Sequence, residues 1–293
     1  MSVRPAVGIF PSCTDRSMPI IELARAAEER GFTTIFLNEH THIPVDHPRS
    51  EWPGGGPTPD TYGRFWDPYI ALAFVAALTG LEVGTAVSLI AEHDPLALAK
   101  AIASLDVLSG GRVVLGVGWG WNREEFEDHG RGPARLRASV MLEHLEVMRR
   151  LWAEDVASFS GDNVHLVPSH AWPKPVHGGT VPVLLGAPSS ERNIDRVVAH
   201  YDGWIPMGAN ALFDDGLEPA LTELRHRWAV AGRDGTGPRI TAIQAAGSAG
   251  RLASALDRAA ELDVERVIVH VGELGERDSL NLLDCLAPAL SAR

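Results

Sequence analysis

Short apolar runs rich in valine and isoleucine recur along the chain, and most precede a longer segment in which apolar residues return at helical spacing. The runs predict eight β-strands, at residues 6–10, 33–38, 82–90, 112–118, 181–186, 203–207, 239–245 and 266–272. The longer segments predict helices at residues 20–31, 67–80, 95–111, 138–155, 190–201, 217–232, 251–263 and 280–291. The alternation of the two periods indicates repeated β/α units.

Glycine follows several of the predicted helices. Gly31, Gly80 and Gly110 stand directly after the last helical residues. A glycine there adopts a left-handed conformation without a Cβ penalty and so ends the helix. We therefore expect these three helices to stop at left-handed residues.

The β/α alternation predicts a parallel sheet covered by helices. Strands that are buried on both faces and separated by helices are typical of parallel sheets. Eight units fit a closed (β/α)8 TIM barrel better than an open doubly wound sheet, which is the alternative architecture. No linker divides the pattern, so residues 1–293 are interpreted as a single domain.

Two insertions interrupt the alternation. The first, residues 41–66, follows the second strand and is crowded with proline, glycine and aromatic residues. The second, residues 158–180, precedes the fifth strand and has the composition of a small hairpin that turns at Gly161-Asp162-Asn163. Irregular loops as long as the first insertion are usually functional or disordered.

Composition and charge narrow the class of protein. A formal net charge of −12 argues against nucleic acid or an anionic membrane as the main partner, because both require clustered lysine and arginine. The chain has two cysteines, no apolar run long enough to span a bilayer, and a beginning unlike a signal peptide. These features favour a cytoplasmic location.

The glycine-rich segment at the end of the fourth strand is not a dinucleotide-binding fingerprint. In Gly116-Val117-Gly118-Trp119-Gly120-Trp121 a tryptophan occupies the place of the last required glycine, and the segment follows the fourth strand rather than the first. The preceding Leu108–Arg112 segment is explained by a helix end that leads into a strand.

The second strand ends at a cluster of polar residues, Asn38, Glu39 and His40, beneath the first insertion. Catalytic groups of a (β/α)8 barrel gather at the carboxyl ends of its strands. His40 is suited to proton transfer at a reacting centre, although it could also serve only local hydrogen bonds. A metal site on His40 and His42 is a further alternative, but the fifth and sixth strand ends offer no additional ligands.

The fifth strand leads into a helix through Gly186-Ala187-Pro188-Ser189-Ser190. A serine there is an ordinary helix N-cap. A helix that begins at the catalytic face can also bind a phosphate with its backbone N–H groups. The sequence supports both interpretations.

Long motifs in this chain resemble the bacterial luciferase-like superfamily of flavin- and deazaflavin-dependent (β/α)8 barrels. The resemblance rests on LDVLSGGRVVLGVGWGWNREEFEDHG (105–130), FLNEHTHIP (36–44), DPYIALAFVAALTGLEVGTAV (67–87) and DGWIP (202–206). Within the superfamily these motifs resemble the coenzyme F-420-dependent oxidoreductases. The motifs cover most of the chain.

The resemblance implies a set of site residues. It implies that His40 lies beside the reactive face of the cofactor ring, that Asn38 and Glu39 lie near its polar edge, and that Ala86-Val87 forms a cis peptide behind it. The pocket wall would be Gly118, Trp119, Gly120 and Trp121, and the phosphate turn Gly186, Ala187, Ser189 and Ser190. The chain departs from the family pattern at three positions. It has Glu39 where relatives often have aspartate, and Trp121 where some relatives have a catalytic glutamate. It has Ala187 where a second glycine is usual.

The resemblance also implies a reaction, a cofactor and partners. It implies hydride transfer between coenzyme F-420 and a hydrophobic organic substrate, with His40 and Glu39 as the catalytic candidates and a homodimer as the assembly. An FMN-dependent monooxygenase supplied with reduced flavin by a partner reductase is the first alternative. A metal-dependent hydrolase and a barrel that binds flavin without turnover are more distant alternatives.

Overall fold

The computed structural model describes residues 4–208, 210–233, 235 and 237–291. The barrel strands are β1 (Ala6–Pro11), β2 (Thr34–Leu37), β3 (Glu82–Ser88), β4 (Val113–Val117), β7 (Val183–Ala187), β8 (Gly203–Pro206), β9 (Arg239–Ala245) and β10 (Arg266–Gly272). The helices are α1 (Ile20–Glu29), α2 (Pro68–Leu78), α3 (Pro95–Ser109), α4 (Arg123–Asp128), α5 (Arg137–Ala153), α6 (Glu191–His200), α7 (Leu217–Val230), α8 (Ala249–Glu261) and α9 (Glu276–Ser291). None of the helices in the described residues is long and apolar enough to cross a bilayer.

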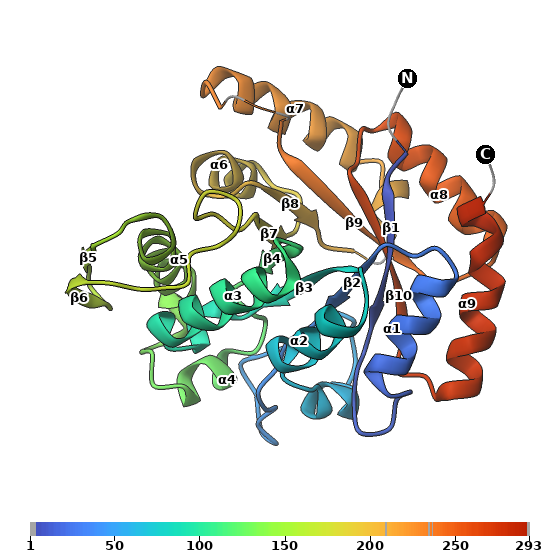
Figure 1. Cartoon of the computed structure of the whole chain (residues 1–293), viewed down its shortest axis with the longest axis horizontal. Helices are drawn as coiled ribbons and strands as arrows, with labels where there is room; N and C mark the ends of the chain where they lie inside the picture. Colours follow the sequence, from blue (N-terminus) through green and yellow to red (C-terminus); the bar gives the residue numbers. More distant parts are fainter. Residues whose placement is uncertain (1–3, 209, 234, 236, 292–293) are drawn as a thin grey trace.

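Eight strands form a closed parallel barrel in the order β1-β10-β9-β8-β7-β4-β3-β2 (Figure 1). Closure is made by β1, which pairs with β10 through Ala6 and Arg266 and with β2 through Gly8 and Thr34. The predicted (β/α)8 barrel is therefore confirmed. The open sheet is excluded because each of the eight barrel strands has a strand neighbour on both sides, which leaves no edge.

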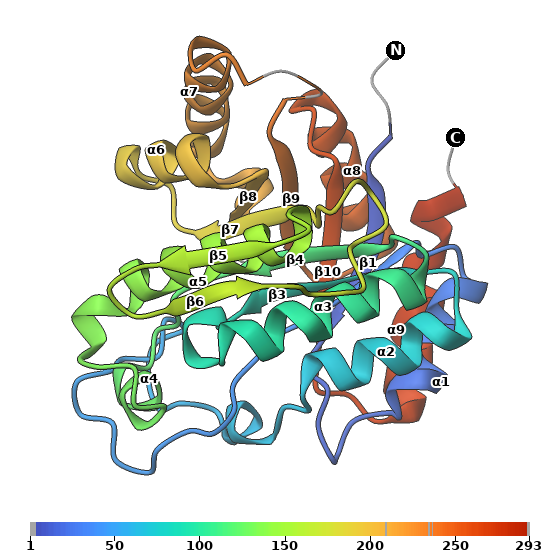
Figure 2. The same cartoon turned by 60° about the vertical axis from the view of Figure 1, so that its left-hand side comes forward.

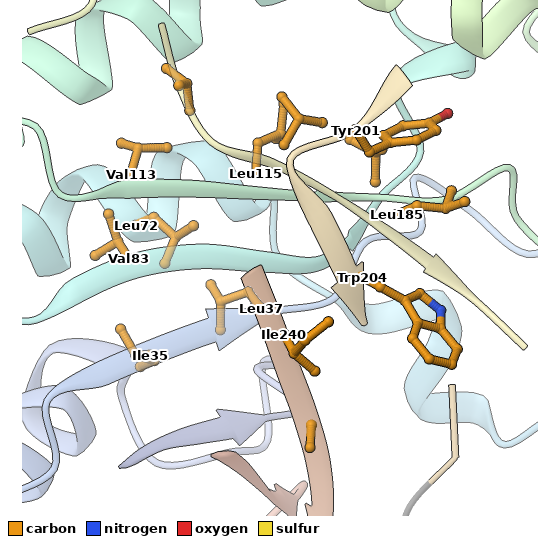
Figure 3. Close-up of a cluster of buried hydrophobic side chains, with 14 of the residues drawn as sticks. Ile35, Leu37, Leu72, Val83, Val113, Leu115, Leu185, Tyr201, Trp204 and Ile240 are labelled. Atoms are coloured by element: carbon orange, nitrogen blue, oxygen red, sulfur yellow. The ribbon is translucent and has the colours of Figure 1, made fainter. Parts of the chain in front are cut away.

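Apolar side chains fill two layers, one inside the barrel and one between the strands and the helices. The inner layer consists of Phe10, Phe36, Ala86, Val114, Leu184, Ile205, Ile243 and Ile268. The outer layer is larger, and Figure 3 shows part of it, including Leu72 of α2 beside Val83 of β3. Residues that alternate along one strand belong to different layers, which is why the strands are apolar throughout.

The second insertion forms an antiparallel hairpin, β5 (Ala157–Ser160) and β6 (His165–Ser169), as the sequence predicts. The hairpin lies outside the barrel beside α5 (Figure 2). The first insertion is irregular except for a short 3-10 turn at Asp60–Arg64.

The helices differ from the predicted ones at the end of α2 and in the presence of α4. Gly31 and Gly110 are left-handed at the ends of α1 and α3, as expected. Gly80 is not, because α2 ends at Thr79 in an extended conformation. The short helix α4 was not among the predicted elements, since six residues are too few to show a helical period.

Gly203 of β8 provides a test of the barrel's close strand packing. A Cβ at this position would overlap the carbonyl oxygen of Arg239 on the neighbouring strand and lie 2.7 Å from Leu184 Cδ2. We expect Gly203→Ala to lower the free energy of unfolding by about 3 kcal/mol, as measured by urea denaturation. Gly275→Ala is the control because a Cβ there meets nothing within 4 Å. Equal unfolding midpoints for the two variants would contradict this account of the packing.

Candidate functional site

His40 follows β2 at the mouth of the barrel, where two side chains from the segment after β4 hold both of its ring nitrogens. The Nδ1 atom is 2.6 Å from Glu125 Oε2, and the Nε2 atom is 3.1 Å from the indole nitrogen of Trp121. An indole N–H can only donate, so Nε2 is the acceptor and Nδ1 carries the proton that Glu125 accepts. Only 6% of the His40 side chain is exposed, and Glu125 is fully buried.

The local sequence explains how Glu125 reaches His40. Asn122 is the N-cap of α4, and its Oδ1 accepts the backbone N–H of Glu125 at 3.0 Å. This cap places Glu125 in the first helical turn, where a carboxylate interacts favourably with the helix dipole. Glu125 Oε1 also accepts the backbone N–H of Thr41 at 2.9 Å, so the carboxylate holds the residues on both sides of the His40–Thr41 peptide.

The first insertion, the 41–66 loop, covers His40 with aromatic rings. The ring centroids of Tyr62 and Phe65 are 5.3 and 6.1 Å from that of His40. Trp52 contacts Tyr62 edge to face. Apart from the polar contacts of the imidazole, the surroundings of His40 are therefore aromatic and suited to an apolar ligand.

Ion pairs fasten both sides of the 41–66 loop to the barrel. On one side Arg49 binds Glu127 of α4 at 2.6 Å. On the other side Arg16 binds Asp60 at 2.8 Å, and Arg64 binds Asp15 at 3.0 Å. The loop is thus attached to the two edges of the site through exposed charges.

Glu39 is held by three donors from the end of β3 and the turn that follows it. Its Oε2 accepts Ser88 Oγ–H at 2.7 Å and the Leu89 backbone N–H at 2.6 Å, while Oε1 lies 2.7 Å from His93 Nε2. Burial alone would raise the pKa of Glu39, but His93 and the other donors outweigh it and lower the pKa. The pKa of His93 is raised by the same pair, so Glu39 and His93 form a buried ion pair. This geometry gives Glu39 a structural task, and its assignment to catalysis stays a prediction.

Glu92 is a third buried carboxyl group in this region. Burial, followed by the charges of Glu125 and Glu39, raises its pKa to about 10. Its Oε2 lies 3.5 Å from His129 Nε2 and has no hydrogen-bond partner among the described residues. The pKa of His129 is lowered, first by burial, so this contact joins two neutral groups at neutral pH and is not an ion pair.

Val87 and two glycines pack together at the ends of β3, β4 and β7. The Ala86–Val87 peptide is cis, as the resemblance implied, and lies where the β3–β4 pairing shifts register. A Cβ on Gly118 would lie 2.7 Å from Val87 Cγ2, and a Cβ on Gly186 would overlap Val87 Cγ1. The glycines therefore make room for the Val87 side chain, which is only partly buried and supplies the apolar face.

The turn after β7 has the features of an anion site. Ser190 caps α6 by accepting the Asn193 backbone N–H, which confirms the predicted serine cap, and Ser189 is exposed. Ala187 is buried, and its carbonyl oxygen accepts the indole N–H of Trp204. The guanidinium of Arg196 lies 5.0 Å from the centre of the Trp119 ring, which brings a positive charge between this turn and the wall after β4.

The other residues that the sequence singled out lie around these groups. Asn38 follows β2 and is half-buried, and Gly120 has a left-handed φ of 69° directly before Trp121. His42 turns toward Asp128 at 3.2 Å rather than joining His40. His270 of β10 stacks at 5.3 Å on Phe10, and burial lowers its pKa. No group of three metal-binding side chains was found within the described ranges.

Comparison with known proteins identifies the family. The model of the luciferase-like monooxygenase family matches residues 12–278, which is most of the chain. The chain belongs to this family. An uncharacterized protein of Mycobacterium tuberculosis is 40% identical over 290 residues, which cover 97% of this chain and 98% of that protein.

More distant luciferase-like relatives carry named activities. An F420-dependent glucose-6-phosphate dehydrogenase of Amycolatopsis mediterranei is 30% identical over 70% of this chain and 58% of its own length. An F420-dependent hydroxymycolic acid dehydrogenase of Mycobacterium tuberculosis is 30% identical over 66% of this chain and 49% of its own length. This chain thus spans about half the length of these two proteins.

Solved structures share the luciferase-like fold. A monooxygenase of Streptomyces bottropensis has a TM-score of 0.77 at 19% identity over 97% of this chain and 98% of its own. An F420-dependent secondary alcohol dehydrogenase in complex with an F420–acetone adduct has a TM-score of 0.74 at 16% identity over 99% of this chain and all of its own. At these identities the similarity shows the fold alone.

Sequence reasoning missed the partners of the strand-end residues in this luciferase-like barrel. It did not pair Glu125 with His40, and it gave Tyr62, Glu92 and His93 no role. The sequence contained some features that point to these partners. Tyr62 stands in the aromatic 41–66 loop, and Asn122 has the spacing of an N-cap that orients Glu125. Nothing in the sequence marks Glu92 as buried.

Glu92 makes the stability of the protein depend on pH. Its pKa is about 10 in the folded protein against an ordinary 4.5, so between about pH 5 and pH 9 the folded state holds a proton that the unfolded chain has released. The free energy of unfolding therefore falls as pH rises through that range. We expect Glu92→Gln to remove this dependence, so that the free energy of unfolding of the variant relative to the unaltered protein is higher at pH 8 than at pH 5 by roughly 4 kcal/mol.

Urea denaturation of both proteins at the two pH values measures this effect. Glu29→Gln, at an exposed position of α1, is the control and should follow the pH dependence of the unaltered protein. An identical pH dependence in Glu92→Gln and the unaltered protein would show that Glu92 ionises normally.

Proposed function

We propose that this luciferase-like protein is an oxidoreductase that transfers a hydride between coenzyme F-420 and a hydrophobic organic substrate. We further propose that the substrate pair is an alcohol and its carbonyl compound. The observation that carries the proposal is the imidazole of His40, held by the buried carboxylate of Glu125 and covered by the aromatic rings of Tyr62 and Phe65.

The His40–Glu125 pair is suited to handle the hydroxyl proton. Glu125 fixes the tautomer in which Nε2 bears the lone pair, and it stabilises the imidazolium that forms when Nε2 takes a proton. Oxidation of an alcohol requires such a base for the O–H proton while the C–H hydride departs with its electron pair. In the reverse direction the same imidazolium returns the proton to the carbonyl oxygen.

The residues present fit a ring cofactor with a phosphate. The face around Val87 has no side chain from Gly118 or Gly186 to obstruct a ring, and the turn at Ser189 and Ser190 opens α6 near Arg196. When bound, coenzyme F-420 would supply the two-electron hydride chemistry. The chain's own residues would orient the ring, exclude water with the aromatic 41–66 loop and move the proton at His40 Nε2.

The choice of F-420 over FMN is supported by the names of the relatives. Proteins at 30% identity are F420-dependent dehydrogenases. An FMN-dependent monooxygenase, which would require a reductase partner, is the alternative, and a long-chain alkane monooxygenase is among the structures that share the fold. A base paired with a carboxylate favours the dehydrogenase, because an alcohol must lose a proton as well as a hydride.

We expect the purified protein to bind coenzyme F-420 at least about tenfold more tightly than FMN and to reduce it with a hydrophobic secondary alcohol. Equilibrium titration followed by absorbance, and then a panel of alcohols, measures both. His40→Ala should retain cofactor affinity while the rate of transfer falls by roughly 10²- to 10⁴-fold, because only the proton acceptor is removed. Preferred binding of FMN would contradict the cofactor assignment, and an unchanged rate in His40→Ala would contradict the role of His40.

We also propose that the protein is a homodimer that associates through α2. This helix lies outside the barrel between α1 and α3 (Figure 1), and exposes Ile70, Phe74 and Leu78 along one side. A two-fold interface buries the same surface on both copies, so each unpaired charge on it would be buried twice. The sequence of α2 contains no charged residue, which suits it to such a contact.

Phe74→Glu tests the homodimer. Phe74 is 56% exposed, and a glutamate there would be buried opposite its symmetry copy in the dimer. We expect the variant to be a folded monomer in analytical ultracentrifugation, while the unaltered protein sediments as a dimer. Val230→Glu, on the exposed side of α7, is the control and should remain dimeric. A dimeric Phe74→Glu variant would place the interface elsewhere.

A further inference from the structure

The lone pair that would accept a proton on His40 is already occupied. Trp121 donates its indole N–H to Nε2 at 3.1 Å, and Glu125 accepts the proton of Nδ1 at 2.6 Å. The imidazole is also covered, with 6% of its side chain exposed. A substrate hydroxyl can reach Nε2 only if one of the groups around the imidazole moves.

Glu125 is not the group that moves. It is fully buried and is held by the Asn122 cap and the Thr41 backbone N–H. If it left His40, a charged group would lose a hydrogen-bond partner inside the protein, which is costly. Glu125 also binds the nitrogen that does not face the substrate.

Trp121 is held much less firmly. Its aromatic contacts are edge contacts with His40 and with Tyr62 and His47 of the 41–66 loop, and it is not among the residues packed against the apolar core. Trp119, two residues earlier, packs against that core and against Arg196. The two tryptophans of the wall after β4 are therefore anchored differently.

The backbone before Trp121 also favours movement. Gly120 has a φ of 69°, a conformation open to glycine, and Gly118 lies against Val87 in the proposed ring face. Two glycines within three residues permit large backbone rotations at little cost. A ring placed on Val87 would lie against the same short segment that carries Trp121.

We propose that Trp121 is a displaceable cap on His40. In the free protein its indole N–H occupies the Nε2 lone pair, and binding of the cofactor ring against Gly118 moves the indole away. The proton-accepting nitrogen then becomes available to a substrate hydroxyl only after the cofactor is bound. The purpose of this cap rests on the proposed function, because binding the cofactor before the substrate matters to a hydride-transfer enzyme.

Chemical modification of His40 tests the cap without any cofactor. Diethyl pyrocarbonate reacts with an accessible, unprotonated imidazole nitrogen, and peptide mass spectrometry measures the rate at each histidine of the full chain. We expect Trp121→Ala to increase the rate at His40 by at least about tenfold. Trp121→Phe, which retains an aromatic ring without the N–H, should increase it by less. Trp172→Ala, at an exposed tryptophan of the 158–180 insertion, is the control and should leave the rate unchanged.

Displacement is tested by fluorine NMR of the protein labelled with 5-fluorotryptophan. The Trp121 resonance is identified by its absence in Trp121→Phe. We expect it to shift on saturation with coenzyme F-420, while that of Trp172 stays in place. A Trp121 resonance that does not respond to bound cofactor, or equal His40 modification in Trp121→Ala and the unaltered protein, would overturn the proposal. Failure of F-420 to bind would instead contradict the proposed function, and the modification rates would still decide whether Trp121 covers His40.

Discussion

The hydrogen bond between His40 and Glu125 connects two parts of the barrel that are not neighbours in the sheet. His40 follows β2 and Glu125 belongs to the helix after β4, with β3 between them. The bond depends on the parallel order of β2, β3 and β4, which brings their carboxyl ends to one rim, and on the Asn122 cap, which orients α4. The tautomer of the imidazole, the position of Trp121 and the path of the chain into the 41–66 loop all depend in turn on this contact.

Three buried glutamates near this bond show how the surroundings of a carboxyl group decide its charge. Glu39 is ionised because His93 and two further donors compensate for its burial. Glu92 has no such donors and stands near two other carboxyl groups, so it retains its proton. The same residue type thus supplies an ion pair at one position and a neutral group at another, and the neutrality of Glu92 avoids repulsion with the other two carboxyl groups.

The sequence revealed the elements of the fold better than the contacts of the site. Strands buried on both faces, such as β4 and β10, appear as apolar runs, and helices such as α3 appear by their period, because both patterns are local. The Gly161–Asn163 turn was likewise visible. His40 could be found because it follows a predicted strand. Its pairing with Glu125 could not, because 85 residues separate them and their distance depends on how β2, β3 and β4 pair in the sheet. Gly80 was misjudged because an extended residue can end a helix as well as a left-handed glycine can.

The ion pairs that attach the 41–66 loop make its attachment to the barrel depend on ionic strength. The ion pairs of Arg49, Arg16 and Arg64 join the loop to the barrel through side chains that are largely in contact with water. Dissolved ions screen such pairs over about 10 Å at ordinary ionic strength, whereas the aromatic contacts under the loop are insensitive to them. Ionic strength therefore acts on the edges of the loop and leaves its underside intact, so that salt loosens the attachment of the loop without dissolving the apolar surface that would receive the substrate.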